Sequence, residues 1–243
     1  MDGYSWEGFS DAEGVIKLRE IFDFARNNKN VKLLCGNHDL ESCWSRMGFS
    51  RTHYEFYSEL HKLYRDNIDL LHPILKIGDT IFTHAGISSG WINTMNNTFK
   101  EEDRNFQLTE ETIIPYIENE WALELQHDKA PNQHWGWASL DSPIFSIGYS
   151  RGGDVPYGGP FWNDFYDYFR HPDGFNCYQV CGHTQRKITG SIGMTDGLAC
   201  IDSRAIFEYY PDTHLIKPSE INDEKTKAEI PEKAWEGDTI RLG

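Results

Sequence analysis

The sequence predicts an α/β fold in one domain. Short apolar runs end in glycine and polar residues, as the strands of an open sheet do, and segments with apolar residues at helical spacing lie between them. The chain of 243 residues has 39% hydrophobic and 14% aromatic residues, which is enough for a packed core.

The first predicted elements are a helix and a strand. Ser10 and Glu13 match the capping-box pattern, and apolar residues at helical spacing predict a helix over residues 11–26. The apolar run Val31–Cys35 predicts a buried strand. A helix that leads into a strand is typical of a βαβ unit, yet no strand pattern precedes this helix. We therefore expect the chain to begin in the middle of such a unit.

Further elements follow along the chain. We expect a second helix over Tyr54–Tyr64, a strand that ends at His84, and mostly helical structure over Asn93–Asp128. The aromatic, glycine-rich block His134–Phe169 predicts irregular loop with a short helix near Trp162–Phe169, followed by strands within Phe175–Gln185 and Gly197–Tyr210. The last residues are charged and weakly patterned, so we expect a domain over residues 1–214 and a tail over 215–243.

Composition limits the partners and the location. The net charge of −15 argues against binding to a nucleic-acid backbone. Five cysteines, an odd number without paired spacing, favour a reducing cytoplasmic location over a disulfide framework. No apolar run approaches the roughly 18 residues of a membrane span, so we expect no membrane partner.

Metal-competent side chains follow three of the predicted strands, each beside a glycine. They are Asn37, His84 and His183. Ligands of open α/β sheets bind outside the carboxyl ends of the strands, so these side chains are candidates for one site. Amide oxygen and imidazole nitrogen suit Mn²⁺, Fe²⁺ or Zn²⁺. Spacing alone leaves a second interpretation open, in which they are turn formers and ordinary histidines.

Two other patterns also have two interpretations. Cys177, Cys181 and His183 could ligate zinc, although the alternation of side chains along a strand explains their spacing more simply. The aromatic section Trp135–Tyr168 could stack a nucleotide base or could be core and loop packing.

The motifs "GNHD", "THAG" and "CGHT", in this order, resemble those of the calcineurin-like metallophosphoesterases, with the Ser/Thr phosphoprotein phosphatase branch closest. The resemblance covers roughly Asp2 to Phe207. It implies a four-layer fold, in which helices flank a β-sandwich, that here lacks its first strands.

The resemblance also implies roles for particular residues. Asn37, His84 and His183 would bind the second metal ion. His38 would be the general acid, held by Asp39. The segment "RGGDVPYGGPFWNDF" resembles one that carries a phosphate-binding arginine, here Arg151, although a solvated surface arginine remains the alternative.

The implied activity is metal-dependent hydrolysis of phosphate monoesters or related esters, in which two divalent ions (Mn, Fe or Zn) activate a water. The substrate would be a phosphorylated small molecule, a nucleotide or a phosphoprotein. Two alternatives stay open: a non-catalytic protein that binds phosphate ligands or a partner, and a nucleotide-pyrophosphate hydrolase.

Two earlier motifs of the family do not occur in this sequence. Asp2 resembles the last aspartate of the second motif, and Gly3 stands where protein phosphatases have an arginine. We therefore expect one retained metal ion or none, and impaired activity. Three explanations remain open: a fragment of a longer enzyme, a truncated protein with weak activity, or a pseudo-enzyme.

Overall fold

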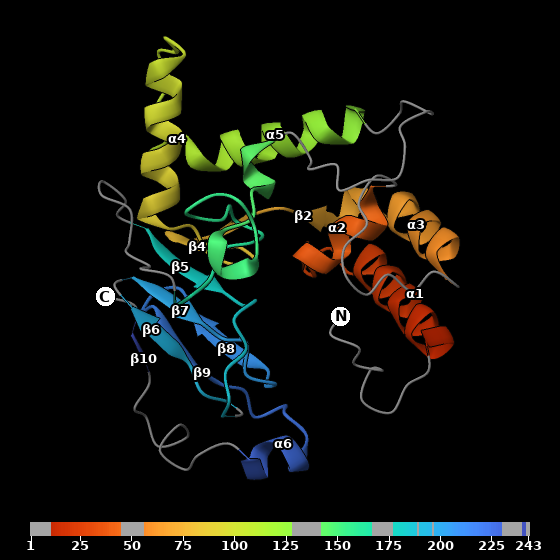
Figure 1. The fold of residues 1–243 in the computed structure, drawn as a ribbon. Helices are drawn as coiled ribbons and strands as arrows, with labels where there is room; N and C mark the ends of the chain where they lie inside the picture. The colour runs from red at the N-terminus through yellow and green to blue at the C-terminus, as the bar shows by residue number, and fades with distance from the viewer. Residues whose placement is uncertain are drawn as a thin grey trace. The chain divides into compact units, whose positions relative to one another are not determined.

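The computed structural model describes residues 11–44, 56–127, 142–166, 177–188, 190–195, 197–229 and 240–241. The chain divides into two compact units (Figure 1): a first unit of Met1–Pro73 and Glu120–Asp141, and a second unit of Ile74–Asn119 and Ser142–Gly243. Within the described ranges, no helix is long and apolar enough to cross a membrane.

The first unit is mainly helical. Its elements are α1 (Asp11–Asn27), β1 (Leu33–Leu34), α2 (Asn37–Cys43), α3 (Tyr57–Asp66), η1 (Ile68–Leu70) and β2 (Leu71–His72). The two short strands pair in parallel. Phe22 of α1 is buried and meets Tyr64 of α3 edge to face, with ring centroids 5.4 Å apart. The predicted helix over 11–26 is confirmed, whereas the predicted strand Val31–Cys35 is shorter than expected.

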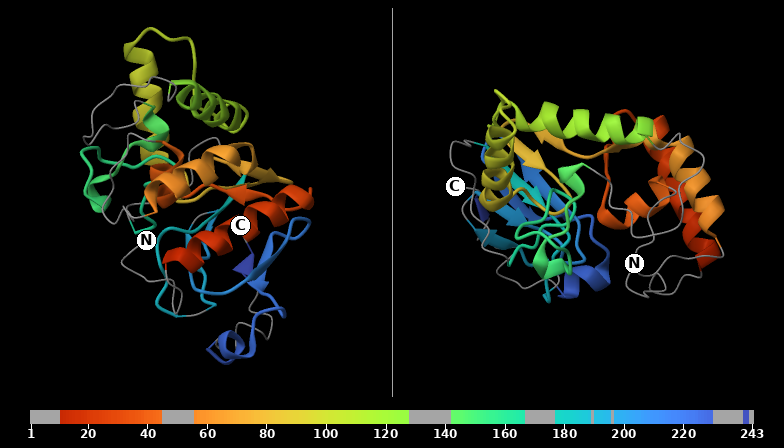
Figure 2. Two further views of the ribbon diagram at one scale, coloured as in Figure 1. Left: turned by 90° about the vertical axis from the view of Figure 1, so that its right-hand side faces the viewer. Right: turned by 45° about the horizontal axis from the view of Figure 1, so that its top comes forward.

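The second unit contains two sheets. Its elements are β3 (Leu75–Ile77), β4 (Thr80–Phe82), α4 (Ser89–Glu101), η2 (Pro143–Phe145), η3 (Tyr149–Arg151), β5 (Tyr178–Cys181), β6 (Gly193–Thr195), β7 (Leu198–Cys200), β8 (Phe207–Tyr210), β9 (Leu215–Pro218), α6 (Glu224–Glu229) and β10 (Ile240–Arg241). Helix α5 (Ile113–His127) contributes residues to both units. Figure 2 shows strands β5 to β9, coloured from teal to blue, from two further sides.

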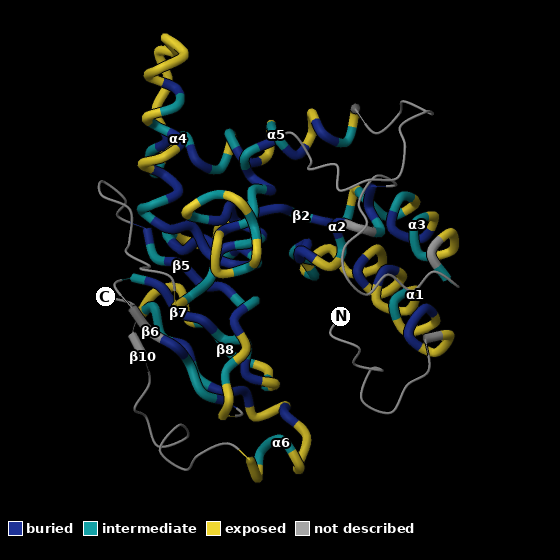
Figure 3. The backbone as a smooth tube through the Cα atoms, in the orientation of Figure 1, coloured by how far each residue is buried: buried dark blue, intermediate teal, exposed yellow. Residues whose placement is uncertain are grey.

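The five-stranded sheet of the second unit has the order β3-β4-β5-β7-β6. Strands β4, β5 and β7 are parallel neighbours, and the edge strands β3 and β6 are antiparallel to theirs. The other sheet, β8-β9-β10, is antiparallel. Parallel strands are buried on both faces and are therefore typically apolar, as the fully buried β7 is (Figure 3). Strand β5 includes one polar residue, Gln179, whose buried amide bonds to the Ile87 backbone.

Apolar side chains join the two sheets. Val180 and Ala199 of the five-stranded sheet form one buried cluster with Ile216 of β9. Phe82 of β4 meets Tyr209 of β8 edge to face, with ring centroids 5.4 Å apart. Strand β9 lies within the region expected to be a tail, and its Ile216 side chain is part of this core.

The structure confirms a mixed α/β fold but differs from the predictions in detail. The predicted helix Tyr54–Tyr64 begins at Tyr57 and ends at Asp66, and the helical section Asn93–Asp128 consists of α4 and α5. The expected strand within Gly197–Tyr210 is two strands, β7 and β8. Nothing in the architecture supports the specific calcineurin-like four-layer sandwich. Asp2, Gly3, Ser10, Trp135 and the end of the predicted helix near Trp162–Phe169 lie outside the described residues.

Candidate active site

Three parallel strands of the second unit end side by side. Strand β4 ends at Phe82, β5 at Cys181 and β7 at Cys200. The backbone alignment continues beyond them: the Gly182 N–H donates to the His84 carbonyl at 2.8 Å, and the Ile201 N–H donates to the Cys181 carbonyl at 2.8 Å. This is the carboxyl edge of the parallel strands, where α/β sheets bind ligands.

Two of the predicted site residues meet at this edge. The Nε2 atom of His84 lies 3.0 Å from the Nδ1 atom of His183, and the ring centroids are 4.8 Å apart. His183 has a backbone φ of 65°, in the left-handed region that costs a non-glycine residue energy. The indole of Trp162 stands edge to face against the His183 ring, with centroids 6.0 Å apart. The hydrogen bond and the ring contact together fix the orientation of the His183 imidazole.

Arg151 is fixed beside His183 from η3. Its Nε lies 2.9 Å from Oδ2 of Asp164. Its Nη2 donates to Oγ1 of Thr184 at 2.9 Å and to the His183 carbonyl at 3.4 Å. The Arg151 side chain is 25% exposed and that of Asp164 is 14% exposed, so solvent screens the ion pair less than it would on an open surface.

Asp164 and Thr184 are themselves held by hydrogen bonds. The second carboxylate oxygen of Asp164 accepts a hydrogen bond from the Tyr166 N–H at 2.8 Å. The buried Thr184 hydroxyl also accepts the Phe165 N–H at 3.0 Å. Both side-chain acceptors of the guanidinium are therefore fixed by further contacts, so the position of Arg151 is set before any ligand binds.

Asp202 is a candidate that the sequence analysis missed. It follows β7, and its carbonyl accepts a hydrogen bond from the Arg186 N–H at 2.6 Å. Asp202 is half-buried, and burial raises the pKa of its carboxyl against the opposing effect of Arg151 and Arg204. It lines a cavity of about 470 Å³ together with residues from Ile201 to Ile206 and three residues near the start of α6. In the sequence, Asp202 follows an apolar strand, as His84 and His183 do, but no glycine stands beside it.

The first unit holds the other predicted site residues. Asn37 begins α2 and is 2% exposed, and His38 beside it is exposed. The Asp39 carboxylate accepts the Gly36 N–H at 2.7 Å and the Tyr64 hydroxyl at 2.5 Å, and burial raises the pKa of Asp39 despite both hydrogen bonds. The roles of His38 and Asp39 remain predictions.

The five cysteines differ in how readily their thiols ionise. All five are free and buried. Burial raises the pKa of Cys35 well above its ordinary value and that of Cys177 to about 12. A thiol that stays protonated near neutral pH is a weak nucleophile, which argues against Cys35 and Cys177. The hydrogen bond with Cys181, by contrast, lowers the pKa of Cys200.

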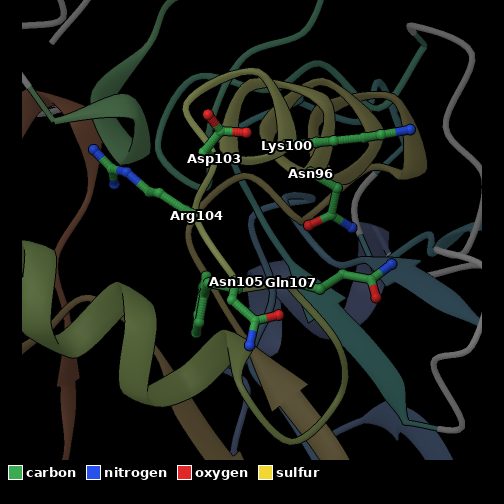
Figure 4. Close-up of a pocket in the computed structure, with 7 residues that line it drawn as sticks. Asn96, Lys100, Asp103, Arg104, Asn105 and Gln107 are labelled. Carbon is green, nitrogen blue, oxygen red and sulfur yellow. The ribbon is translucent and has the colours of Figure 1, made fainter.

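A second cavity, of about 640 Å³, lies around the end of α4. It is lined by Asn96, Lys100, Asp103, Arg104, Asn105, Phe106 and Gln107 (Figure 4). The charged ends of Lys100 and Arg104 point away from each other, and the Asn96 amide is occupied by the Leu108 backbone at 2.7 and 3.3 Å. The side chains do not converge on a common point, so the candidate site stays at the strand edge.

The expectation of a divalent metal centre (Mn, Fe or Zn) is corrected by the structure. No group of three or more His, Cys, Asp or Glu residues in the described part of the chain could hold a metal ion. Of the three expected ligands, His84 and His183 bond to each other, and Asn37 belongs to the first unit.

Comparisons with known proteins show a likeness of fold. No family model matches the chain, and no curated protein matches it. A crystal structure of a cold-active protein-tyrosine phosphatase of the psychrophile Shewanella sp. matches 85% of this chain with a TM-score of 0.52 and 19% identity. A point mutant described as a cold-active protein tyrosine phosphatase matches 79% of it with a TM-score of 0.48 and 21% identity, and 55% of its own chain is covered. This chain spans 62% of the length of the first structure's chain.

These comparisons correct the family expected from the three short motifs. The solved structure whose fold this chain shares is described as a protein-tyrosine phosphatase, and no family model supports membership in the calcineurin-like metallophosphoesterases. An identity of 19% shows the fold alone.

Proposed function

We propose that this chain is a phosphatase that hydrolyses phosphate esters at the carboxyl edge of β4, β5 and β7. The observation that carries the proposal is the hydrogen-bonded pair of His84 and His183, 3.0 Å apart, with Arg151 fixed alongside. The likeness of fold to a structure described as a protein-tyrosine phosphatase supports the same class of reaction.

Each group at the edge has a part in this proposal. A guanidinium suits the oxygens of a phosphate geometrically and keeps its charge at every relevant pH, so Arg151 would bind the phosphoryl group. In a hydrogen bond between two imidazoles one nitrogen donates and the other accepts, so the pair can hold a proton at a defined position.

The proposal extends to phosphate esters in general. A nucleotide pyrophosphate or a phosphopeptide would place the same phosphoryl group against Arg151, so a panel of substrates must separate them. The non-catalytic alternative predicts binding of phosphate without turnover. A cytoplasmic location remains a prediction from the cysteine content.

The test is turnover by the purified chain. We would assay p-nitrophenyl phosphate, phosphotyrosine and phosphoserine peptides and diadenosine tetraphosphate, in EDTA and again with added Mn²⁺. We expect phosphate release in EDTA that is lost in His183→Asn and kept in Arg104→Ala, a matched change at the cavity of Figure 4.

Two outcomes would overturn these conclusions. Release of phosphate that is equal in the wild type and in His183→Asn would place the chemistry elsewhere. Turnover that begins only when Mn²⁺ is added would contradict the correction of the metal centre.

A further inference from the structure

We propose that Gln179 of β5 is a positioning residue of the site, which holds the loop after β4 so that His84 reaches His183. This inference rests on the proposed phosphatase function and deepens it. Three features of Gln179 carry it: the two hydrogen bonds of its amide, its burial in the sheet, and the place of both bonds relative to the two imidazoles.

The Gln179 side chain binds both backbone groups of one loop residue. Its Oε1 atom accepts the Ile87 N–H at 2.9 Å, and its Nε2 atom donates to the Ile87 carbonyl at 3.0 Å. Ile87 belongs to the β4–α4 loop, residues 83–88. A side-chain amide carries the same kinds of donor and acceptor as a peptide group. Gln179 therefore pairs with Ile87 as a neighbouring strand would, at a point where the chain has left β4.

Burial explains why this position needs a glutamine. Gln179 and Ile87 are each 1% exposed. Gln179 stands in the middle strand of the five-stranded sheet, paired with Ile81 of β4 and Leu198 of β7. A buried amide is unfavourable unless it is hydrogen-bonded, and both polar groups of this one bind Ile87. An apolar residue would suit the sheet itself, so the requirement for an amide comes from the loop.

The two hydrogen bonds attach the loop that carries His84. The His84 carbonyl accepts the Gly182 N–H at 2.8 Å, and Gly182 directly follows β5. The loop is thus joined to the β5 segment at His84 and again at Ile87, and the same segment leads to His183. The distance of 3.0 Å between the imidazoles therefore depends on contacts between two adjacent chain segments.

Other contacts hold the first half of the loop. The Ala85 N–H donates to the Pro160 carbonyl at 2.8 Å, and the Gly86 N–H donates to the Thr83 hydroxyl at 3.0 Å. Neither bond involves Ile87. Removal of the Gln179 amide should therefore release Ile87 from β5 and displace His84 slightly, while the loop keeps its other attachments. A displacement of about 1 Å at a reacting group costs on the order of 10²-fold in rate.

The first experiment compares Gln179→Met with the wild type and with Ile216→Ala. Methionine keeps the length of the side chain and removes both hydrogen bonds. We expect Gln179→Met to lower kcat for p-nitrophenyl phosphate by about 10- to 100-fold, with little change in KM because Arg151 binds the phosphate from another segment. Ile216→Ala alters the core of the same unit away from this loop, so it should keep kcat at a temperature at which all the proteins are folded.

Gln179→Glu adds a pH profile that a merely structural role would not move. A protonated carboxyl has a donor and an acceptor, as the amide has, whereas a carboxylate has acceptors only and repels the Ile87 carbonyl. We expect the kcat of Gln179→Glu, relative to the wild type at the same pH, to be highest at acid pH and to fall as pH rises. The same ratio for Gln179→Met should stay low at every pH.

Nitrogen-15 NMR of the histidine rings tests the inference without turnover. The hydrogen bond between His84 and His183 fixes which nitrogen of each ring carries the proton. We expect the signals of both rings, assigned with His84→Asn and His183→Asn, to change in Gln179→Met and to stay the same in Ile216→Ala.

The outcomes separate this inference from the function on which it rests. A wild type without turnover overturns the proposed function, and the ring signals then decide the role of Gln179. Unchanged ring signals in Gln179→Met overturn the positioning role, and so does a wild-type kcat in that variant. If Gln179→Met does not fold, the pH profile of Gln179→Glu decides, and a ratio to the wild type that does not vary with pH overturns the role.

Discussion

His84 and His183, 99 residues apart in sequence, share a hydrogen bond of 3.0 Å between Nε2 and Nδ1. The bond exists because β4 and β5 are parallel neighbours, so the residues that follow them emerge at the same edge. Each ring fixes the orientation and the protonated nitrogen of the other, which makes the pair one functional unit.

Because the two imidazoles act as a unit, the losses of kcat/KM caused by replacing each of them should not be additive. We expect His84→Asn and His183→Asn each to lower kcat/KM for p-nitrophenyl phosphate by at least about 10²-fold. The double variant should be little worse than the worse single one. Steady-state kinetics of the four proteins measures this, and losses that multiply would show that the histidines act independently.

Arg151 should be sensitive even to replacement by lysine. Its guanidinium reaches Asp164 with Nε and Thr184 with Nη2, and a single ammonium cannot make both contacts and still bind phosphate. Hydrogen bonds to charged groups contribute about 1.5–3 kcal/mol, so we expect Arg151→Lys to lower kcat/KM by roughly 10- to 100-fold, mainly through KM. The matched control is Arg104→Lys, and an unchanged KM in Arg151→Lys would contradict the assigned role.

The sequence predicted the imidazole pair for a physical reason. A parallel strand is an apolar run, and the polar residue that ends it marks the edge of the sheet, so His84 and His183 could be found without the structure. Asp202 obeys the same rule but was missed, because a flanking glycine was taken as part of the pattern. The partner of Arg151 could not be predicted, since the contact with Asp164 depends on the path of an irregular loop.

The family resemblance failed for a related reason. "GNHD", "THAG" and "CGHT" are turn sequences of four residues, and such turns report local geometry after a strand more than the arrangement of the whole chain. The likeness of fold, by contrast, extends over 85% of the chain. The charged composition of residues 215–243 likewise led to the prediction of a tail. The apolar Ile216 within this region packs in the core of the second unit.

The role of Ile216 gives a prediction about stability. Its side chain is 2% exposed and packs with Val180 and Ala199 of the other sheet. We expect Ile216→Ala to reduce the free energy of unfolding by about 2–5 kcal/mol. Ile221→Ala, at a site that is 75% exposed, should change it by less than about 0.5 kcal/mol. Urea unfolding measures both, and equal effects would mean that residues beyond 214 do behave as a tail.

The carboxyl of Asp39 should make the stability of the first unit depend on pH. Burial raises its pKa above the ordinary value, so the folded state binds this proton more tightly than the unfolded state does. The stabilisation from protonated Asp39 is therefore complete below the unfolded pKa and is lost as pH rises through the folded pKa. Asp39→Asn removes the titration, so the stability of the wild type relative to this variant should fall as pH rises through that window.

Tyr64→Phe tests the cause of this dependence. The Tyr64 hydroxyl donates to Asp39 at 2.5 Å and lowers the pKa of Asp39 against the effect of burial. Without that donor the pKa should rise further, which moves the loss of stability to higher pH. Urea unfolding between pH 4 and 8, followed by the fluorescence of buried Trp44, would show the shift. A difference between wild type and Asp39→Asn that does not vary with pH would mean that Asp39 titrates alike in the folded and unfolded chain.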